Sequence, residues 1–378
     1  MRMPLFRGMK RWGVLLSALL LSSLLLAACG GNSPSILNPS GPVALKESNL
    51  FWFILVVASI VFVAVEGLLI YSIVRFRERP NSPAAIQTHG NTTVEIIWTI
   101  VPSVFLFVVL IGTIYTMFGL KTFSSTGSPI QIKVVGHQWW WEFDYLNEHI
   151  VTADELVIPE NTRIVAQLQS NNVIHSFWVP ELFGKTDVIP GHNNTSEFSA
   201  DPGTAGKSFR GQCTEFCGLQ HAHMNFYVIV KSQDDYNAWL TAQQQAAAAN
   251  PAQQAALAGQ KLFLGSGGCQ GCHGIVGVNL QDYNHLKGGG DASVLVGPNL
   301  THFGSRRQIA GAILQWDPAS CVVVTGTDGQ PKIENPGSCG LYQWLHDPQA
   351  VKPGNDMIIR PLSDTEIAQL IAYLESLT

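Results

Sequence analysis

Two long apolar segments constrain this chain of 378 residues more than any other feature. The first, residues 50–74, has Glu66 as its only charged residue, and the second, residues 94–120, has Glu95 near its start and Pro102 inside. About 20 apolar residues span the hydrocarbon core of a bilayer, so each segment is long enough to cross a membrane. Buried helices of a soluble protein are the alternative, but such helices are seldom this long.

Basic residues predict how the two segments are oriented. The loop between them begins Arg75-Phe-Arg77-Glu-Arg79-Pro80, and arginine-rich loops stay in the cytoplasm. The N-terminus agrees with export, because four cations precede an apolar run at 12–26, which predicts a signal peptide over residues 1–28. These cations are Arg2, Arg7, Lys10 and Arg11. Both soluble parts would then lie on the outer face of a bacterial plasma membrane, where disulfides can form.

The signal peptide ends in Leu26-Ala-Ala-Cys29, which resembles a bacterial lipoprotein box. By that resemblance, cleavage precedes Cys29 and its thiol receives lipid. An ordinary signal peptide followed by an incidental cysteine is the alternative.

The exported parts are acidic. Without the four cations of the signal, the chain has 18 basic and 27 acidic residues, a net charge of −9, which argues against a nucleic-acid partner. Residues 121–240 hold 7 basic and 13 acidic residues, and residues 252–378 hold 7 and 10. An acidic surface suits a basic protein as an external partner.

Three further regions follow the membrane segments. Residues 128–235 contain alternating runs at 130–135, 163–168, 208–212 and 225–230, which predict strands of a sandwich or barrel. Residues 236–254 are rich in Ala and Gln and predict a linker, partly helical. Residues 255–378 look mostly helical, and the last helix begins with a capping box, Ser363 and Glu366. Residues 29–48 form a further linker before the membrane hairpin of residues 49–120.

A cluster of metal-binding residue types lies in the all-β region. It reads Cys213-Thr-Glu215-Phe-Cys217-Gly-Leu-Gln-His221-Ala-His223-Met224, with His175 upstream. Soft thiolates, imidazoles and a thioether together favour copper, and two thiolates can bridge two copper ions. A structural zinc site or a disulfide with incidental histidines is the alternative, but zinc does not need Met224 and a disulfide does not need His175.

Four motifs in this order resemble the cytochrome c oxidase subunit II family with its dinuclear copper (CuA) domain. The first motif, Val94-Glu95-Ile-Ile-Trp98-Thr-Ile-Val-Pro102, begins the second apolar segment, and the second, Gly136-His-Gln-Trp139-Trp140-Trp141-Glu-Phe, is an aromatic run. The third, Lys185-Thr-Asp187-Val-Ile-Pro-Gly191, precedes the cysteines, and the fourth is the cysteine cluster itself. The resemblance covers about residues 45–235 and implies a cupredoxin-like fold for the all-β region.

The resemblance also implies roles for single residues. The copper ligands would be His175, Cys213, Cys217, His221, Met224 and the backbone carbonyl of Glu215. The Glu215 side chain would reach a magnesium ion shared with subunit I. Trp139 would receive electrons, while Trp140 and Trp141 are core residues by default. Glu95 would stand at the mouth of a proton path; without the family, a solvated acid at the helix end is preferred.

A second cofactor motif, Cys269-Gln-Gly-Cys272-His273, predicts covalent attachment of haem c with His273 as an axial ligand. Redox or zinc chemistry is the alternative for the two cysteines alone. Met357 is the only methionine after residue 224, and Met/His ligation suits an electron carrier. Residues 255–378 resemble a small, all-α cytochrome c, including Gly297-Pro-Asn-Leu300. They differ in having Met357-Ile-Ile-Arg-Pro361 where many relatives have Met-Pro, and in a long segment at 317–344.

Together these resemblances imply a multidomain subunit II of a haem–copper cytochrome c oxidase fused to a cytochrome c. Electrons would pass from an external donor protein to haem c, then to dinuclear copper, then to subunit I, where oxygen is reduced to water and protons are pumped; subunit III is a further expected partner. A nitric oxide reductase partner and a copper metallochaperone are the rivals. Glu95 and Trp98 argue against the first, and the haem motif and Trp139 argue against the second.

Two cysteines remain, Cys321 and Cys339, and we expect them to form a disulfide. The other five are assigned to lipid, copper and haem. The stretch between the two is rich in Gly and Pro, so the chain there must turn back. Two buried, unpaired cysteines are the alternative.

Overall fold

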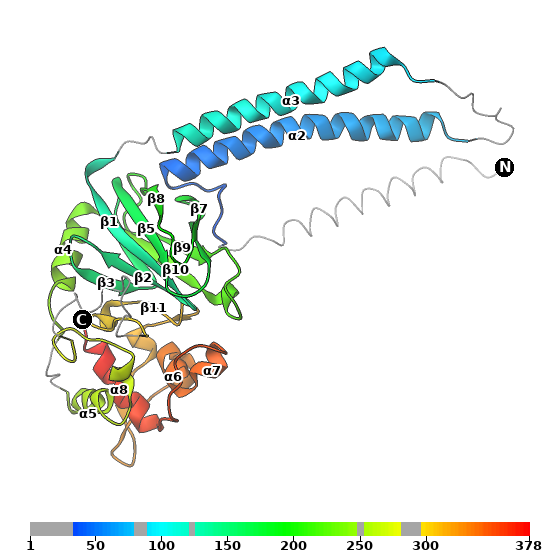
Figure 1. The fold of residues 1–378 in the computed structure, drawn as a ribbon. Coiled ribbons are helices and arrows are strands. Elements are labelled where there is room, and N and C mark those ends of the chain that lie inside the picture. Colours follow the sequence, from blue (N-terminus) through cyan, green and yellow to red (C-terminus); the bar gives the residue numbers. More distant parts are fainter. Residues whose placement is uncertain (1–32, 79–88, 121–124, 248–252, 281–295) are drawn as a thin grey trace, which may run out of the picture.

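The fold is described from a computed structural model, which covers residues 33–78, 89–120, 125–247, 253–280 and 296–378. The predicted signal peptide of residues 1–28 and the predicted lipid site Cys29 lie outside the described residues. Three parts follow one another in space: a helical hairpin, a β module and a mostly helical module at the far side of the β module (Figure 1). This arrangement confirms the predicted fold class.

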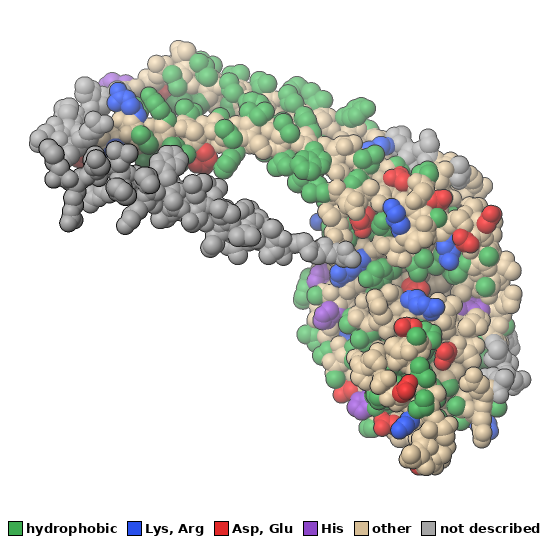
Figure 2. Space-filling view, turned by 180° about the vertical axis from the view of Figure 1, so that it is seen from behind, with side chains coloured by type: hydrophobic (Ala, Val, Ile, Leu, Met, Phe, Trp, Pro, Cys, Tyr) green, Lys and Arg blue, Asp and Glu red, His purple; other side chains and the backbone are tan. Residues whose placement is uncertain are grey.

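The hairpin consists of α2 (Pro42–Arg75) and α3 (Thr92–Gly119), each long and apolar enough to cross a membrane. Apolar side chains cover its surface, whereas charged side chains gather on the other two parts (Figure 2). Asn91 caps α3 by accepting hydrogen bonds from Thr93 N and Val94 N at 3.1 and 3.3 Å. The hairpin therefore has the two long apolar helices that the predicted membrane anchor requires.

The hairpin is joined to the β module through the first turns of α2. These turns occupy residues expected to be linker, because they find a partner there: Val43, Ala44 and Ser48 are buried, and Ala44 N donates to Leu182 O at 3.2 Å. A Cβ on Gly41 would lie 2.5 Å from Ser199 O, so the chain approaches the module too closely for a side chain. The Lys46 ammonium binds Gly119 O and so ties the outer ends of α2 and α3 together.

The β module contains two five-stranded sheets, in the orders β3-β2-β1-β5-β8 and β4-β10-β9-β6-β7. The strands are β1 (Thr126–His137), β2 (Trp140–Tyr145), β3 (Ile150–Ala153), β4 (Glu155–Pro159), β5 (Thr162–Ser170), β6 (His175–Val179), β7 (Phe183–Val188), β8 (Asn194–Phe198), β9 (Ser208–Cys213) and β10 (Asn225–Lys231). Alternation in β5 buries every second side chain, as the sequence predicts. Aromatic rings fill the space between the sheets; Phe177 and Phe226 stack at 4.8 Å, and Trp141 packs against both.

Helix α4 (Gln233–Gln243) follows β10 directly and packs on the β module. Trp239 lies 5.3 Å from the Tyr145 ring, and Tyr236 is buried. The first half of the expected linker is thus part of the folded module. The Ser232 side chain caps this helix by accepting from Asp235 N at 3.1 Å.

The C-terminal module is built on two crossing helices, α5 (Gln254–Leu264) and α8 (Asp364–Glu375). They pack so closely that a Cβ on Gly259 would lie 2.0 Å from Gln369 O. Ser363 and Glu366 form the predicted capping box of α8. The short helices α6 (Gly340–His346) and α7 (Pro348–Val351) complete the helical part.

The same module also has two short ribbons that an all-α expectation does not include. They are β11 (Gln308–Ile309) with β12 (Leu314–Gln315), and β13 (Val323–Thr325) with β14 (Pro331–Ile333). A tight turn containing Gly329, at a φ of 77°, closes the second ribbon. A buried disulfide joins Cys321 to Cys339 across it, with the two Cα atoms 4.8 Å apart.

Candidate functional site

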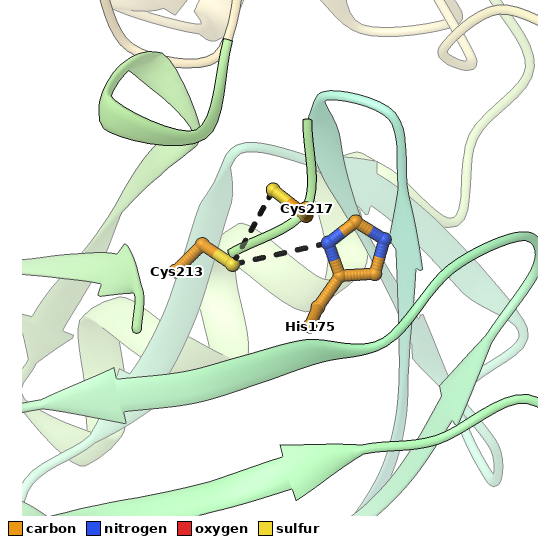
Figure 3. A group of neighbouring side chains, drawn as sticks. All are labelled: His175, Cys213 and Cys217. Carbon is orange, nitrogen blue, oxygen red and sulfur yellow. Dashed lines mark hydrogen bonds between the residues drawn. The ribbon is translucent and has the colours of Figure 1, made fainter. Parts of the chain in front are cut away.

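The predicted metal ligands of the β module converge at one end of the sheets. His175 starts β6 and Cys213 ends β9, two strands that pair antiparallel through Phe177 and Cys213. Cys217 lies in the loop that follows. One ligand atom from each of these three buried residues lies within 4.8 Å of the others. Figure 3 shows the three side chains pointing toward one another.

Three further donors complete the cluster. The Cys217 sulfur lies 3.7 Å from that of Cys213, 3.5 Å from His221 Nδ1 and 3.8 Å from Met224 Sδ. The Cys213 sulfur also lies 3.2 Å from the carbonyl oxygen of Glu215, whose side chain is exposed. The structure therefore brings together all six residues that the sequence predicts as ligands.

The charge of the cluster suits a cation. A hydrogen bond from Cys217 lowers the pKa of the Cys213 thiol, and the same bond together with burial raises the pKa of Cys217. Metals bind cysteine as the thiolate, so binding a metal would release the protons that these thiols hold. A donor set of two sulfurs, two imidazoles and a thioether fits copper better than zinc, because zinc sites do not use methionine.

A residue that the sequence did not single out orients the first histidine. Asn172 Oδ1 lies 3.0 Å from His175 Nε2, so Nε2 carries the proton and Nδ1 faces Cys213 as a free donor, 3.8 Å from its sulfur. Such partners fix the ring and the tautomer of a ligand histidine. An asparagine three residues before the histidine carries no motif that would have marked it.

The aromatic run leads away from the cluster. The indole nitrogen of Trp139 donates to Cys217 O at 2.9 Å, and the Gln138 amide donates to the same oxygen at 2.7 Å. Trp141 is fully buried, as expected of a core residue. Trp140 is only half-buried and stacks on His137 with ring centroids 4.1 Å apart, so it is not a core residue. The reason is its place at the rim of a hollow between the two modules.

This hollow has a volume of about 450 Å³ and contains the second predicted site. Cys269, Cys272, His273 and Met357 line it from the C-terminal module, and Trp139 and Trp140 line it from the β module. The hollow thus borders both Trp139 and the haem attachment motif.

The histidine in the hollow is prepared to act as a ligand. His273 Nδ1 donates to Pro298 O at 2.8 Å, which leaves Nε2 as the free donor atom. Burial lowers the pKa of His273, so the ring stays neutral. A Cβ on Gly297 would lie 2.6 Å from this ring, so the Gly297-Pro-Asn-Leu300 motif gives the imidazole its space. These residues fit a haem c.

Two acidic residues of the hairpin, of which only Glu95 was predicted to have a functional role, lie outside both sites. Glu95 is exposed in the first turn of α3, at the end of the hairpin that points away from the β module (Figure 1). Glu66 lies within α2, and the structure places it beside neither cluster.

Comparison with known proteins agrees with this arrangement. A family model described as "Cytochrome C oxidase subunit II, transmembrane domain" matches residues 35–115, and one described as its periplasmic domain matches residues 148–232. Cytochrome c oxidase subunit 2 of Alkalihalophilus pseudofirmus is 32% identical over 98% of this chain and 99% of its own length. The chain belongs to the cytochrome c oxidase subunit II family. It is therefore a membrane subunit of a haem–copper oxidase complex, with two transmembrane helices and a periplasmic-type domain.

Two further proteins are similar to this chain. Cytochrome c oxidase subunit 2 of Bacillus sp. strain PS3 is 31% identical over 98% of this subunit II and 99% of its own length. The C-terminal module is thus part of the sequence shared with both relatives. The crystal structure of the periplasmic domain of subunit II of cytochrome oxidase of Bradyrhizobium japonicum is 29% identical, covers 30% of this chain and 92% of that chain, and has a TM-score of 0.29.

Proposed function

We propose that this subunit II carries electrons from an external donor protein, through its C-terminal module and then its β module, to subunit I. Haem c and a dinuclear copper centre, when bound, supply one-electron redox chemistry. Oxygen is then reduced to water in subunit I, and protons are pumped across the membrane. Subunit I and subunit III are the proposed membrane partners.

One observation carries this proposal: Trp139 borders both sites. Its indole donates to Cys217 O, and its ring lines the hollow that contains Cys269, Cys272 and His273. A metallochaperone would have no use for such a link, which argues against that rival. The proposed roles follow: Cys269 and Cys272 attach haem, His273 and Met357 are its axial ligands, and Trp139 passes electrons on.

The copper ligands in this proposal are His175, Cys213, Cys217, His221, Met224 and the carbonyl of Glu215. The side chain of Glu215 is exposed beside Phe216 and Leu219, which are 76% and 71% exposed. Apolar exposure of this extent supports a protein interface. We assign this face to subunit I, with magnesium held in part by Glu215.

At the inner end of the hairpin, Glu95 is the proposed mouth of a proton path into subunit I, a role that distinguishes an oxidase from a nitric oxide reductase partner. Lipid on Cys29 is proposed as a third membrane attachment.

Metal content and spectra of the purified complex test the proposal. Beyond the copper that subunit I contains, we expect two copper atoms and one haem c for each copy of this chain, a near-infrared copper band and a mixed-valence copper signal in electron paramagnetic resonance. Cys217→Ser should abolish that signal and leave the haem c spectrum unchanged. One copper per chain, or zinc in its place, would contradict the proposal.

A further inference from the structure

A lysine is buried where the two soluble modules meet. Lys352 follows α7 and is 3% exposed. Its ammonium donates to three carbonyl oxygens, those of Trp139 at 2.6 Å, His223 at 3.0 Å and Ala310 at 2.9 Å. An ammonium has three protons, so every donor has a partner. Trp139 and His223 belong to the β module, whereas Ala310 and Lys352 belong to the C-terminal module.

A buried charge is unfavourable unless other groups compensate for it. Burial lowers the pKa of Lys352 to about 8, and the carboxylate of Asp154 opposes that shift. Asp154 is also buried, and it accepts from Trp141 N at 2.9 Å and from Gly311 N at 3.0 Å. The two opposite charges therefore each bind main-chain groups of both modules.

The loop that receives these bonds is shaped for close approach. Ala310, Gly311 and Ala312 have φ values of 59°, 73° and 57°, a left-handed conformation that is unfavourable for alanine. It directs Gly311 O to Asn225 N at 3.1 Å. A Cβ on Gly311 would lie 2.4 Å from Lys352 Nζ and 2.8 Å from Trp139 O. The absence of a side chain at Gly311 is thus needed for the contact between the two modules, and not only for the turn.

More bonds surround this network. Glu155 accepts from Arg307 N at 2.6 Å and from Gln308 N at 2.8 Å, and Asn299 donates to Val151 O at 2.8 Å. These bonds also cross the interface, but on the β module they reach residues 151 and 155 rather than Trp139. The lysine is distinct because its bonds reach the main chain of Trp139 and of His223, the residue before Met224.

We infer that Lys352 is a positioning residue that locks the C-terminal module onto the β module in one orientation, with the haem hollow facing Trp139. The inference deepens the proposed function and rests on it for its electron-transfer consequence. A fusion joined by a linker alone would only raise the local concentration of the donor. If Lys352 holds the C-terminal module in place, the haem hollow also keeps one orientation relative to Trp139.

The test compares Lys352→Met with Lys332→Met in the complete, purified oxidase complex; Lys332 is exposed on β14 and serves as the control. Hydrogen–deuterium exchange is followed at residues 223–227 and 306–312, where the interface amides of Asn225 and Gly311 lie. We expect exchange at least tenfold faster in Lys352→Met and unchanged in the control. Haem c to copper electron transfer, measured after flash reduction, should slow at least tenfold, with unchanged copper and haem c spectra.

A second pair of variants changes Gly311, the residue that lies against Lys352 in the same contact. Gly311→Ala should have the same effects, whereas Gly329→Ala, with a similar φ of 77° and no atom within 4 Å of its added Cβ, should not. This pair decides the outcome if Lys352→Met fails to assemble. Exchange in the Lys352 and Gly311 variants equal to that in the controls would overturn the inference. Wild-type complex without copper or haem c signals would instead overturn the proposed function, while the exchange comparison would still test the lock.

Discussion

The β module and the C-terminal module build their sites in opposite ways. In the β module, ten strands and a continuous aromatic core hold His175 and Cys213, and ligand atoms lie within 4.8 Å of one another. In the C-terminal module, loops and short helices form one side of a hollow of about 450 Å³, and Trp139 and Trp140 of the β module line the other side. A sheet fixes its strand ends through main-chain hydrogen bonds. An open hollow has no such support, because the atoms that line it lack packing partners on one side. Strands thus fix the ligands of one site, whereas the other site leaves room for a group as large as the proposed haem.

Removing the haem attachment should therefore have the largest effect. In Cys269→Ala/Cys272→Ala, we expect the C-terminal module to lose most of its free energy of unfolding, about 5 kcal/mol or more, which is the whole net stability of many domains. The β module should keep its copper band and its strands. Thermal unfolding followed by circular dichroism and by the copper band checks this. Cooperative unfolding of the C-terminal module at its wild-type temperature would contradict the proposal that this module depends on the haem for its stability.

The disulfide is the next largest contribution to the same module. Cys321→Ala/Cys339→Ala should lower its free energy of unfolding by about 3 kcal/mol, because the crosslink restricts the unfolded chain. Denaturant unfolding followed at the haem c absorbance measures the loss, and the copper band serves as the internal control. Mass spectrometry without reductant tests the pairing itself; alkylation of both cysteines in the wild type would contradict it.

Two matched helix caps, one in each module, test with smaller effects whether the two modules unfold separately. Ser363→Ala removes the cap of α8 and should lower the stability of the C-terminal module by about 1 kcal/mol. Ser232→Ala removes the equivalent bond in α4 and should act on the β module instead. The midpoints at the haem c and copper absorbances should shift separately. A shift of both midpoints in both variants would mean that the two modules unfold as one unit.

The smallest expected effect depends on pH. A hydrogen bond from Arg360 lowers the pKa of Glu366 to about 2, below its ordinary value of 4.5. Because the folded form binds the proton less tightly, this carboxylate stabilises the module above pH 4.5, and the contribution is lost as the pH falls toward 2. Glu366→Gln should flatten this dependence in the haem c unfolding midpoint and leave the copper midpoint unchanged. An identical pH profile in the variant would exclude the pair as its source.

The features that the sequence predicted are those that local pattern determines. Alternation marked β5, the Ser363 and Glu366 pair marked the start of α8, and the spacing of Cys213 and Cys217 marked the metal cluster. Lys352 could not be found in this way, since its sequence neighbours are those of an ordinary surface lysine. Its burial depends on a contact between residues more than 200 positions apart, Trp139 and Lys352. The half-buried position of Trp140 could not be predicted for the same reason, because the hollow beside it is lined by residues far away in the sequence.

The junction between α2 and the β module has a geometric consequence. The helix continues without a break from Pro42, packed on the module, to Arg75 at the other end of the apolar span. Each residue of an α-helix turns the chain by about 100° and advances it by about 1.5 Å. One residue inserted after Ser48 would therefore swing the sulfur cluster around the membrane normal by about a quarter-turn or more while raising it very little. The helix therefore fixes the rotation of the cluster about the membrane normal far more strictly than its distance from the membrane.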